Sequence, residues 1–211
     1  MPDIGTPLYR SSSVLLRLLF RLFNRWEVTG LEHVPSTGGV VLIANHTSYS
    51  DPPIVGTASP RPVHFMAKAE LFDKPLLGAF IRRTHAFPVR RGAADRTALR
   101  RAVRLLREGK VLLVFPEGTR SPDGRLQELE QGAAFIALSG KAAVVPVGLV
   151  GADRLLPKGS LILRPAKLHV RFGPPVDLSD LRGQRLTREI LAQACRQMAA
   201  GMRALLPEER Q

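Results

Sequence analysis

Residues 40–46 read VVLIANH, a run of five apolar residues that ends abruptly at Asn45 and His46. A short, unbroken apolar run rich in β-branched residues is typical of a strand that is buried on both faces of a sheet. α/β folds present chemical groups where such strands end, because the strand fixes the backbone and the following loop exposes its side chains. This stretch therefore predicts the fold class and one place to look for a site.

Apolar runs of the same kind recur along the chain and alternate with helical patterns. Further strands are predicted at residues 63–66, 86–89, 111–115, 143–150 and 167–172. Helices are predicted at residues 97–107, 132–138 and 187–206, whereas Pro75 and Gly78 break the pattern between two of the strands. This alternation predicts an α/β fold with a mixed, mainly parallel sheet flanked by helices.

Residues 13–26 have an amphipathic helical pattern, with Arg17, Arg21 and Arg25 on one face and a wide apolar arc that ends at Trp26. A basic amphipathic helix suits the boundary between anionic lipid headgroups and acyl chains. A helix packed on the core with its arginines exposed would have the same pattern. We expect residues 1–28 to form a membrane-surface helix and residues 29–211 to form one globular domain.

The chain carries 31 Lys and Arg residues against 18 Asp and Glu, a formal net charge of +13. Such an excess indicates an anionic partner, such as an anionic membrane surface, a phosphorylated small molecule or a nucleic acid. A GC-rich genome would produce the same arginine bias. Aromatic residues are only 6% of the chain and no nucleic-acid-binding motif occurs, so we expect no nucleic-acid partner.

Several other classes of protein lack support in the sequence. The single cysteine, Cys195, excludes a disulfide framework and a cysteine-based metal site, and favours a reducing, cytosolic compartment. The histidines show no metal-ligand spacing, and no Gly-x-Ser-x-Gly elbow of a serine hydrolase occurs. No apolar run approaches the roughly 20 residues that span a bilayer, and no signal-peptide cleavage site follows the N-terminal apolar stretch.

The loop after residues 40–44 contains a histidine and an aspartate five residues apart, His46 and Asp51. A neutral imidazole can take the proton of an attacking hydroxyl, and a carboxylate can orient the ring and stabilise the imidazolium that forms. A spacing of five does not place two side chains on one helical face, so this pair requires a bend between them. Asp51 before Pro52 is also what a helix N-cap would need without any catalysis.

The loop after residues 111–115 reads PEGTRS and offers a glycine, a hydroxyl and a guanidinium, groups suited to a phosphate or a developing oxyanion. Further cations follow the predicted strands at Lys68, Arg90 and Arg91. As isolated features, these residues would equally be a polar turn and solvated surface charges.

Taken together, four ordered blocks resemble the glycerolipid acyltransferase family, with the bacterial 1-acylglycerol-3-phosphate acyltransferase branch as the nearest match. The blocks are Asn45-His46 with Asp51 in an HX4D spacing, FPVRR at 87–91, FPEGTR at 115–120 and VVPV at 144–147. The resemblance covers residues 29–175. It implies a glycerol-3-phosphate acyltransferase-like fold with the site at strand ends.

The resemblance also implies roles for individual residues. His46 corresponds to a general base and Asp51 to its orienting carboxylate, with direct attack of an acceptor hydroxyl on an acyl thioester and no covalent enzyme intermediate. Pro146 of the fourth block corresponds to a residue that shapes the sheet, and His85 stands where the family often has a small residue. The implied substrate-binding residues are Lys68, Arg91, Glu117, Gly118, Thr119 and Arg120.

The function implied is transfer of a fatty acyl chain from acyl-CoA or acyl-carrier protein to the free hydroxyl of 1-acyl-sn-glycerol 3-phosphate. The product would be phosphatidic acid for phospholipid biosynthesis. We expect no metal, no bound cofactor and a peripheral place on the cytoplasmic face of the cell membrane. Two alternatives remain: another lysolipid or glycolipid acceptor, and a non-enzymatic binder of anionic membranes or nucleic acid.

Overall fold

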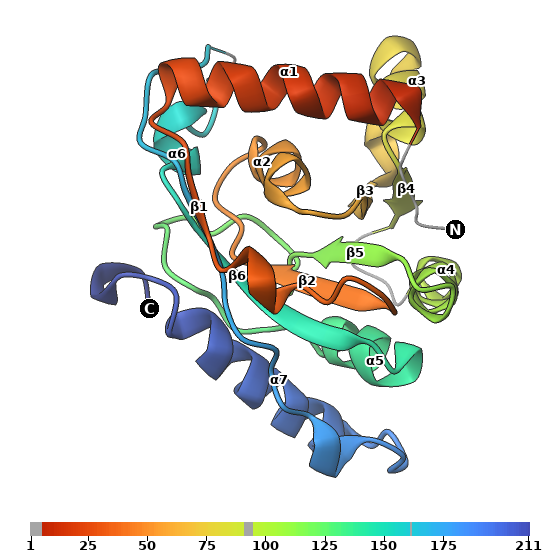
Figure 1. The fold of residues 1–211 in the computed structure, drawn as a ribbon. Helices are drawn as coiled ribbons and strands as arrows, with labels where there is room; N and C mark the ends of the chain where they lie inside the picture. The colour runs from red at the N-terminus through yellow and green to blue at the C-terminus, as the bar shows by residue number, and fades with distance from the viewer. Residues whose placement is uncertain (1–5, 91–94, 161) are drawn as a thin grey trace.

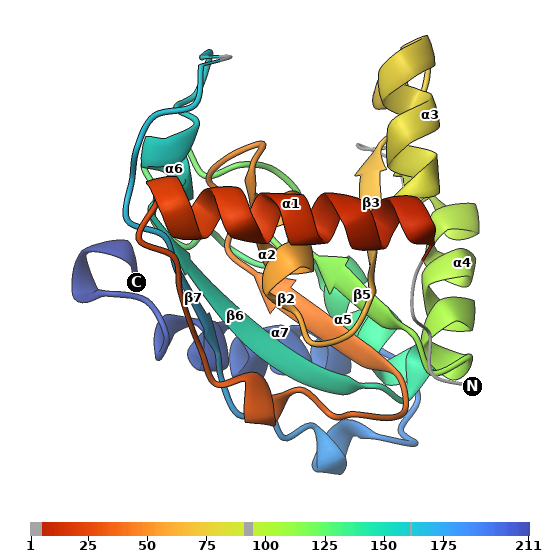
Figure 2. The same cartoon turned by 45° about the horizontal axis from the view of Figure 1, so that its top comes forward.

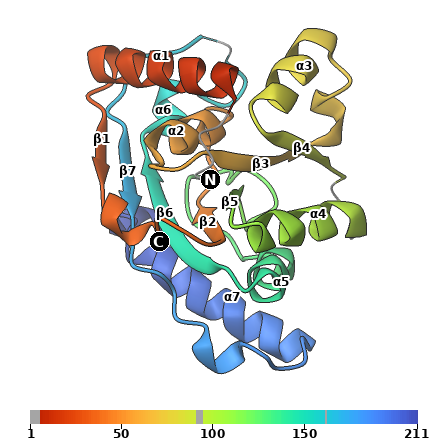
Figure 3. The ribbon, with the colours of Figure 1, turned by 45° about the vertical axis from the view of Figure 1, so that its right-hand side comes forward.

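The computed structural model describes residues 6–90, 95–160 and 162–211. Within these ranges the strands form one sheet (Figure 1), in the order β1-β7-β6-β2-β5-β3-β4, which the labels of Figure 3 follow. Every neighbouring pair is parallel except β6 and β7. The predicted mixed, mainly parallel sheet is therefore confirmed. The strands are β1 (Glu27–Thr29), β2 (Val40–Ala44), β3 (Val63–Lys68), β4 (Ala86–Val89), β5 (Val111–Val114), β6 (Ala143–Val150) and β7 (His169–Phe172).

Helices cover both faces of the sheet, as Figure 3 shows. α1, α2 and α6 lie on one face, and α4, α5 and α7 lie on the other. The fold is thus a three-layer α/β sandwich. The α-helices are α1 (Pro7–Phe23), α2 (Asp51–Ala58), α3 (Pro75–Arg83), α4 (Arg96–Arg107), α5 (Gln131–Gly140), α6 (Ala152–Leu155) and α7 (Arg188–Arg203).

The central strand β2 contributes to both layers of the core. Val41 and Ile43 join the cluster under α4, α5 and α7. Val40, Leu42 and Ala44 join the cluster under α1 and α2. All five residues are fully buried, as expected of a strand covered by helices on both faces. The burial on both faces that was predicted from residues 40–44 is confirmed.

The prediction missed α3, because Pro75 and Gly78 were interpreted as breaks. Pro75 occupies the first helical turn, where the absence of a backbone N–H costs nothing. Gly78 lies where the backbone of Phe72 leaves no room for a Cβ, so close packing explains the glycine. β1 was also missed, and its pairing with β7 places Glu27 and Val28 in the sheet rather than with the N-terminal helix.

The N-terminal helix begins earlier and ends earlier than predicted. The Thr6 hydroxyl accepts a hydrogen bond from the Tyr9 backbone N–H, which caps α1, and the helix ends at Phe23. Trp26 lies beyond the helix and stacks on Phe20 with ring centroids 5.0 Å apart. No helix in the described ranges has both the length and the apolar character needed to cross a bilayer.

Candidate active site

The two loops singled out in the sequence lie side by side at one edge of the sheet. β2 and β5 are parallel neighbours in which Ile43 pairs with Val114, so both strands end at the same level. Two hydrogen bonds join the loops that follow. The backbone N–H of Ser121 donates to the His46 carbonyl at 2.7 Å, and the backbone N–H of His46 donates to Oε1 of Glu117 at 2.7 Å.

His46 and Asp51 form a buried pair in which Nδ1 lies 2.7 Å from Oδ2. The same carboxylate oxygen accepts the backbone N–H groups of Thr47 and Ser48 at 2.7 and 2.8 Å, which holds the bend that the spacing requires. Because a carboxylate only accepts, Nδ1 carries the hydrogen and Nε2 keeps the lone pair of a base. The local geometry therefore suits proton abstraction at Nε2.

The N-cap interpretation of Asp51 is wrong. Asp51 is the first residue of α2, and Ser50 occupies the N-cap position without a capping hydrogen bond from its side chain. The Asp51 carboxylate instead turns back to His46 and to the loop that precedes it. Its burial is thus explained by its contact with the histidine.

Glu117 is turned into the protein. Its Oε1 accepts from His46 as described, and its Oε2 accepts the backbone N–H of Gln127 at 3.0 Å. Burial raises the pKa of the Glu117 carboxyl above its ordinary value, while the backbone N–H donors of Gln127 and His46 act in the opposite direction. Oε1 thus fastens the loop after β5 to His46, and Oε2 holds Gln127 of the same loop. Direct contact of Glu117 with an acceptor stays a prediction.

The next residues of the second loop differ in exposure. Gly118 has φ +68°, a left-handed conformation that favours glycine, and the Glu130 carboxylate lies where a Cβ would be. The Thr119 side chain is exposed. The guanidinium of Arg120 lies over the ring of Tyr49, 3.7 Å from its centroid, and so places a cation beside the His46 loop.

The remaining predicted cations differ in their positions and contacts. Lys68 ends β3, the strand beside β5, and its ammonium lies 3.1 Å from Oε1 of Glu70 while half exposed. Arg91 lies outside the described residues. Arg90 is exposed, and its backbone N–H donates to Oδ2 of Asp95 at 3.0 Å. The structure thus brings together His46, Asp51, Glu117, Gly118 and Arg120, with Lys68 at the same edge of the sheet.

Two further residues shape the site without having been predicted. Phe115 stacks on the imidazole of His46 with centroids 4.1 Å apart, which shields one face of the ring. The Asn45 side chain donates to the Leu149 carbonyl at 3.0 Å and accepts the Leu149 backbone N–H at 2.8 Å, so it ties the end of β2 to β6. Their positions beside His46 and Glu117 in the sequence were the available signal.

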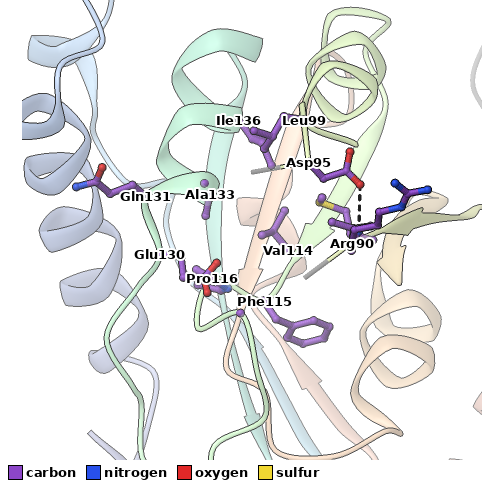
Figure 4. A pocket seen from close by; sticks show the side chains of 14 residues that line it. Arg90, Asp95, Leu99, Val114, Phe115, Pro116, Glu130, Gln131, Ala133 and Ile136 are labelled. Atoms are coloured by element: carbon purple, nitrogen blue, oxygen red, sulfur yellow. Dashed lines mark hydrogen bonds between the residues drawn. The ribbon is translucent and has the colours of Figure 1, made fainter. Parts of the chain in front are cut away.

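A cavity of about 560 Å³ lies beside this constellation, on the side of the sheet covered by α4 and α5. Its walls are largely apolar, and its polar lining includes Arg90, Asp95, Glu130 and Gln131 (Figure 4). Phe115 lines the cavity and also stacks on His46, so the cavity adjoins the proposed base. The apolar lining residues are Met66, Val89, Leu99, Val114, Phe115, Pro116, Ala133 and Ile136.

Comparison with known proteins places this site within a known family. A family model described as Acyltransferase matches residues 25–150, more than half of the chain. The chain belongs to the acyltransferase family. The matched span contains His46, Asp51, Lys68 and residues 117–120. Within the described residues, no cluster of three or more potential metal-ligating side chains accompanies them.

Individual acyltransferases resemble the chain over most of its length. A 1-acyl-sn-glycerol-3-phosphate acyltransferase of Bacillus subtilis strain 168 is 30% identical over 174 residues, which cover 82% of this chain and 84% of the relative. One from Limnanthes alba is 34% identical over 157 residues, 73% of this chain but 55% of the plant protein. The crystal structure of PlsC, the 1-acyl-sn-glycerophosphate (LPA) acyltransferase of Thermotoga maritima, superposes on this chain with a TM-score of 0.76. The two sequences are 28% identical, and the superposition covers 93% of this chain and 78% of the PlsC chain.

Proposed function

We propose that this acyltransferase moves a fatty acyl chain from acyl-CoA or acyl-carrier protein to the free hydroxyl of 1-acyl-sn-glycerol 3-phosphate, forming phosphatidic acid. The observation that carries the proposal is the buried His46–Asp51 pair with a cation and an apolar cavity beside it. The named activity of the bacterial and plant relatives supports the choice of acceptor.

The chemistry assigned to the pair is direct transfer. Nε2 of His46 takes the acceptor hydroxyl proton as that oxygen attacks the thioester carbonyl carbon, and a tetrahedral intermediate forms. The intermediate collapses with cleavage of the C–S bond, and the thiolate leaving group takes the proton from the imidazolium. Asp51 stabilises the imidazolium between these two steps. No acyl-enzyme forms, and no metal or bound cofactor takes part.

The cations near His46 are assigned to the phosphate of the acceptor. Arg120 offers a planar guanidinium, and Lys68 offers an ammonium at the neighbouring strand end. Arg91 is the third cation of the proposed set. An anionic acceptor fits these groups better than an uncharged glycolipid, because a cation near the base attracts a phosphate and gains nothing from a neutral sugar.

The apolar cavity beside Phe115 is assigned to an acyl chain. Met66, Leu99 and Ile136 form part of its apolar wall, and the charged side chains of Arg90, Asp95 and Glu130 also line it. An acyl chain in the cavity would lie next to the His46 loop, because Phe115 both lines the cavity and stacks on the His46 ring. We assign the carboxyl end of the chain to the side nearer His46.

We also propose that the enzyme works on the cytoplasmic face of the cell membrane as a peripheral protein, with no nucleic-acid partner. α1 buries Tyr9 and Phe20 but leaves several large apolar side chains more than half exposed, so packing on the core does not account for its whole apolar arc. These exposed residues are Val14, Leu15, Leu18, Leu22 and Phe23.

The experiment is acyl transfer from radiolabelled acyl-CoA, and separately from acyl-carrier protein, to a panel of lysophospholipids in detergent micelles. We expect the parent enzyme to use lysophosphatidic acid in preference to lysolipids with larger headgroups. Arg120→Ala should raise the KM for lysophosphatidic acid, whereas Arg185→Ala, an exposed arginine beyond the matched family span, should not. Transfer to no acceptor from either donor would contradict the proposal.

A further inference from the structure

The apolar residues exposed on this protein are concentrated on one side of the molecule. Figure 2 shows α3 and the loop of residues 156–165, of which 156–160 and 162–165 are described, projecting past α1 on the same side. The most exposed large apolar residue of the described ranges is Leu76 on α3, at 89%. Ile162 and Leu163 in the loop are 74% and 63% exposed. Three segments far apart in the sequence thus expose apolar side chains together.

Both projections are attached to the active-site edge of the sheet. α3 follows the C-terminal end of β3, the parallel neighbour of β5, through the short 3-10 helix Ala69–Leu71. The 156–165 loop begins at Leu156, whose carbonyl accepts a hydrogen bond from the Ser48 hydroxyl at 2.9 Å. Ser48 lies in the loop that carries His46. The two projections therefore stand on either side of the catalytic loop.

The loop is a defined projection rather than a continuation of the sheet. The backbone N–H of Arg164 donates to the Leu155 carbonyl at 2.8 Å, which closes the base of the loop. Leu155 itself is buried in the core, while Ile162 and Leu163 beyond this bond are exposed. The base of the loop is thus held on the core, and its apolar residues extend away from the base.

The charge around these apolar residues is predominantly positive, with Asp73 as the acidic residue just before α3. Residues 74–85 contain Lys74, Arg82 and Arg83, residues 156–167 contain Lys158, Arg164 and Lys167, and neither stretch contains an acidic residue. α1 likewise has arginines and no acidic residue. Apolar tips flanked by cations suit a surface that offers acyl chains beneath anionic headgroups. Two copies of this surface would repel each other.

We propose that α3 and the 156–165 loop are two membrane-inserting projections that flank the mouth of the active site and, with α1, hold it against an anionic bilayer. The acceptor would then enter from the leaflet without crossing water. This inference rests on the proposed function only for the identity of the acceptor, because the docking itself is read from exposure and charge.

The test compares vesicle binding of the parent with that of three variants. Two are the single variants Leu76→Ser and Ile162→Ser, and the third is a triple variant that combines both with Leu163→Ser. Leu31→Ser is the matched control, because Leu31 is also an exposed apolar residue (38%) and its 3-10 helix lies at the opposite end of the molecule in Figure 2. Sedimentation would use phosphatidylcholine vesicles with and without phosphatidylglycerol. We expect the parent and Leu31→Ser to bind the anionic vesicles and the triple variant to bind at least about tenfold more weakly. Undiminished binding by the triple variant would overturn the proposal.

A second readout separates docking from catalysis. Turnover of long-chain lysophosphatidic acid in anionic vesicles should fall at least about tenfold in the triple variant, while turnover of a short-chain, monomeric lysophosphatidic acid should equal that of the parent. Equal losses on both acceptors would show that these residues serve the site or the fold, and would overturn the docking proposal. Failure of the parent to use either acceptor would contradict the proposed function, while vesicle binding would still decide the docking.

Discussion

The region around His46 buries polar groups, whereas α1 and α3 expose apolar ones. Asp51 is 0% exposed and Leu76 is 89% exposed, the reverse of the usual distribution of carboxylates and leucines. Around His46, hydrogen bonds within the protein offset the cost of burial. The exposed apolar side chains of α1 and α3, by contrast, are not covered by any other part of the described chain. We attribute the buried polar groups to catalysis and the exposed apolar side chains to the membrane contact proposed above.

Apart from removal of the base itself, the largest expected effect comes from Asp51→Asn. The amide presents an N–H₂ group toward donors that need an acceptor, and it can no longer stabilise the imidazolium of His46. We expect turnover to fall about 10³- to 10⁴-fold. Steady-state transfer to lysophosphatidic acid measures the effect, with the exposed Asp180→Asn as control. A loss below about tenfold would mean that the pair does not act as a base and its orienting carboxylate.

Phe20→Ala tests the buried face of α1. Phe20 is 5% exposed and stacks on Trp26, so its removal should lower the free energy of unfolding by about 3–5 kcal/mol. Thermal or denaturant unfolding in the absence of lipid measures this. An unchanged stability would show that α1 is not held on the core in solution.

Glu117→Gln tests the positioning contacts of the second loop. The amide nitrogen would meet a backbone N–H of either His46 or Gln127, leaving one donor unpaired at a cost of about 1–3 kcal/mol. We expect a lower kcat with little change in the KM for the acceptor, because Glu117 touches the backbone of the base. A rise confined to KM would instead support acceptor binding by Glu117.

The raised pKa of Glu117 predicts a pH dependence for this comparison. A carboxyl whose pKa is raised by folding binds protons more readily in the folded state. Its contribution to stability is therefore fully present below the ordinary pKa of 4.5 and declines as pH rises through the raised pKa. The stability advantage of the parent over Glu117→Gln should therefore be larger at about pH 4 than at about pH 7. Denaturant unfolding at both pH values checks this, and an advantage that grows with pH would contradict it.

The smallest effect on stability is expected at the exposed face of α1. Leu18→Ser and Leu22→Ser should change the free energy of unfolding by no more than about 0.5 kcal/mol, because these side chains are 54% and 67% exposed. The same variants should weaken binding to anionic vesicles. A large loss of stability would mean that both faces of the helix serve the fold.

The central strand and both active-site loops could be predicted from the sequence, because a fully buried strand has a simple apolar pattern and polar residues mark its end. α3 could not, because proline and glycine break helices in general, and only the structure shows that Pro75 lies in a first turn and Gly78 against Phe72. β1 is three residues long, too short to carry a pattern.

The identity of the site residues was easier to predict than their orientation. A carboxylate at Glu117 is equally compatible with a group that faces the substrate and one that faces the protein. The inward direction follows from the backbone N–H groups of His46 and Gln127. The sheet places His46 there, and the loop after β5 brings back Gln127, ten residues further along the chain than Glu117. Sequence spacing does not contain that information.

The most direct test of the account is acyl transfer by His46→Ala, measured beside the parent with the same acyl thioester and lysophosphatidic acid. The circular dichroism and unfolding of the two proteins should be compared first, so that a loss of activity is not a loss of fold. We predict that turnover falls by about 10⁴-fold or more, at least as far as in Asp51→Asn, while the fold persists. Turnover by a folded His46→Ala protein that equals that of the parent would contradict the assignment of His46 as the base.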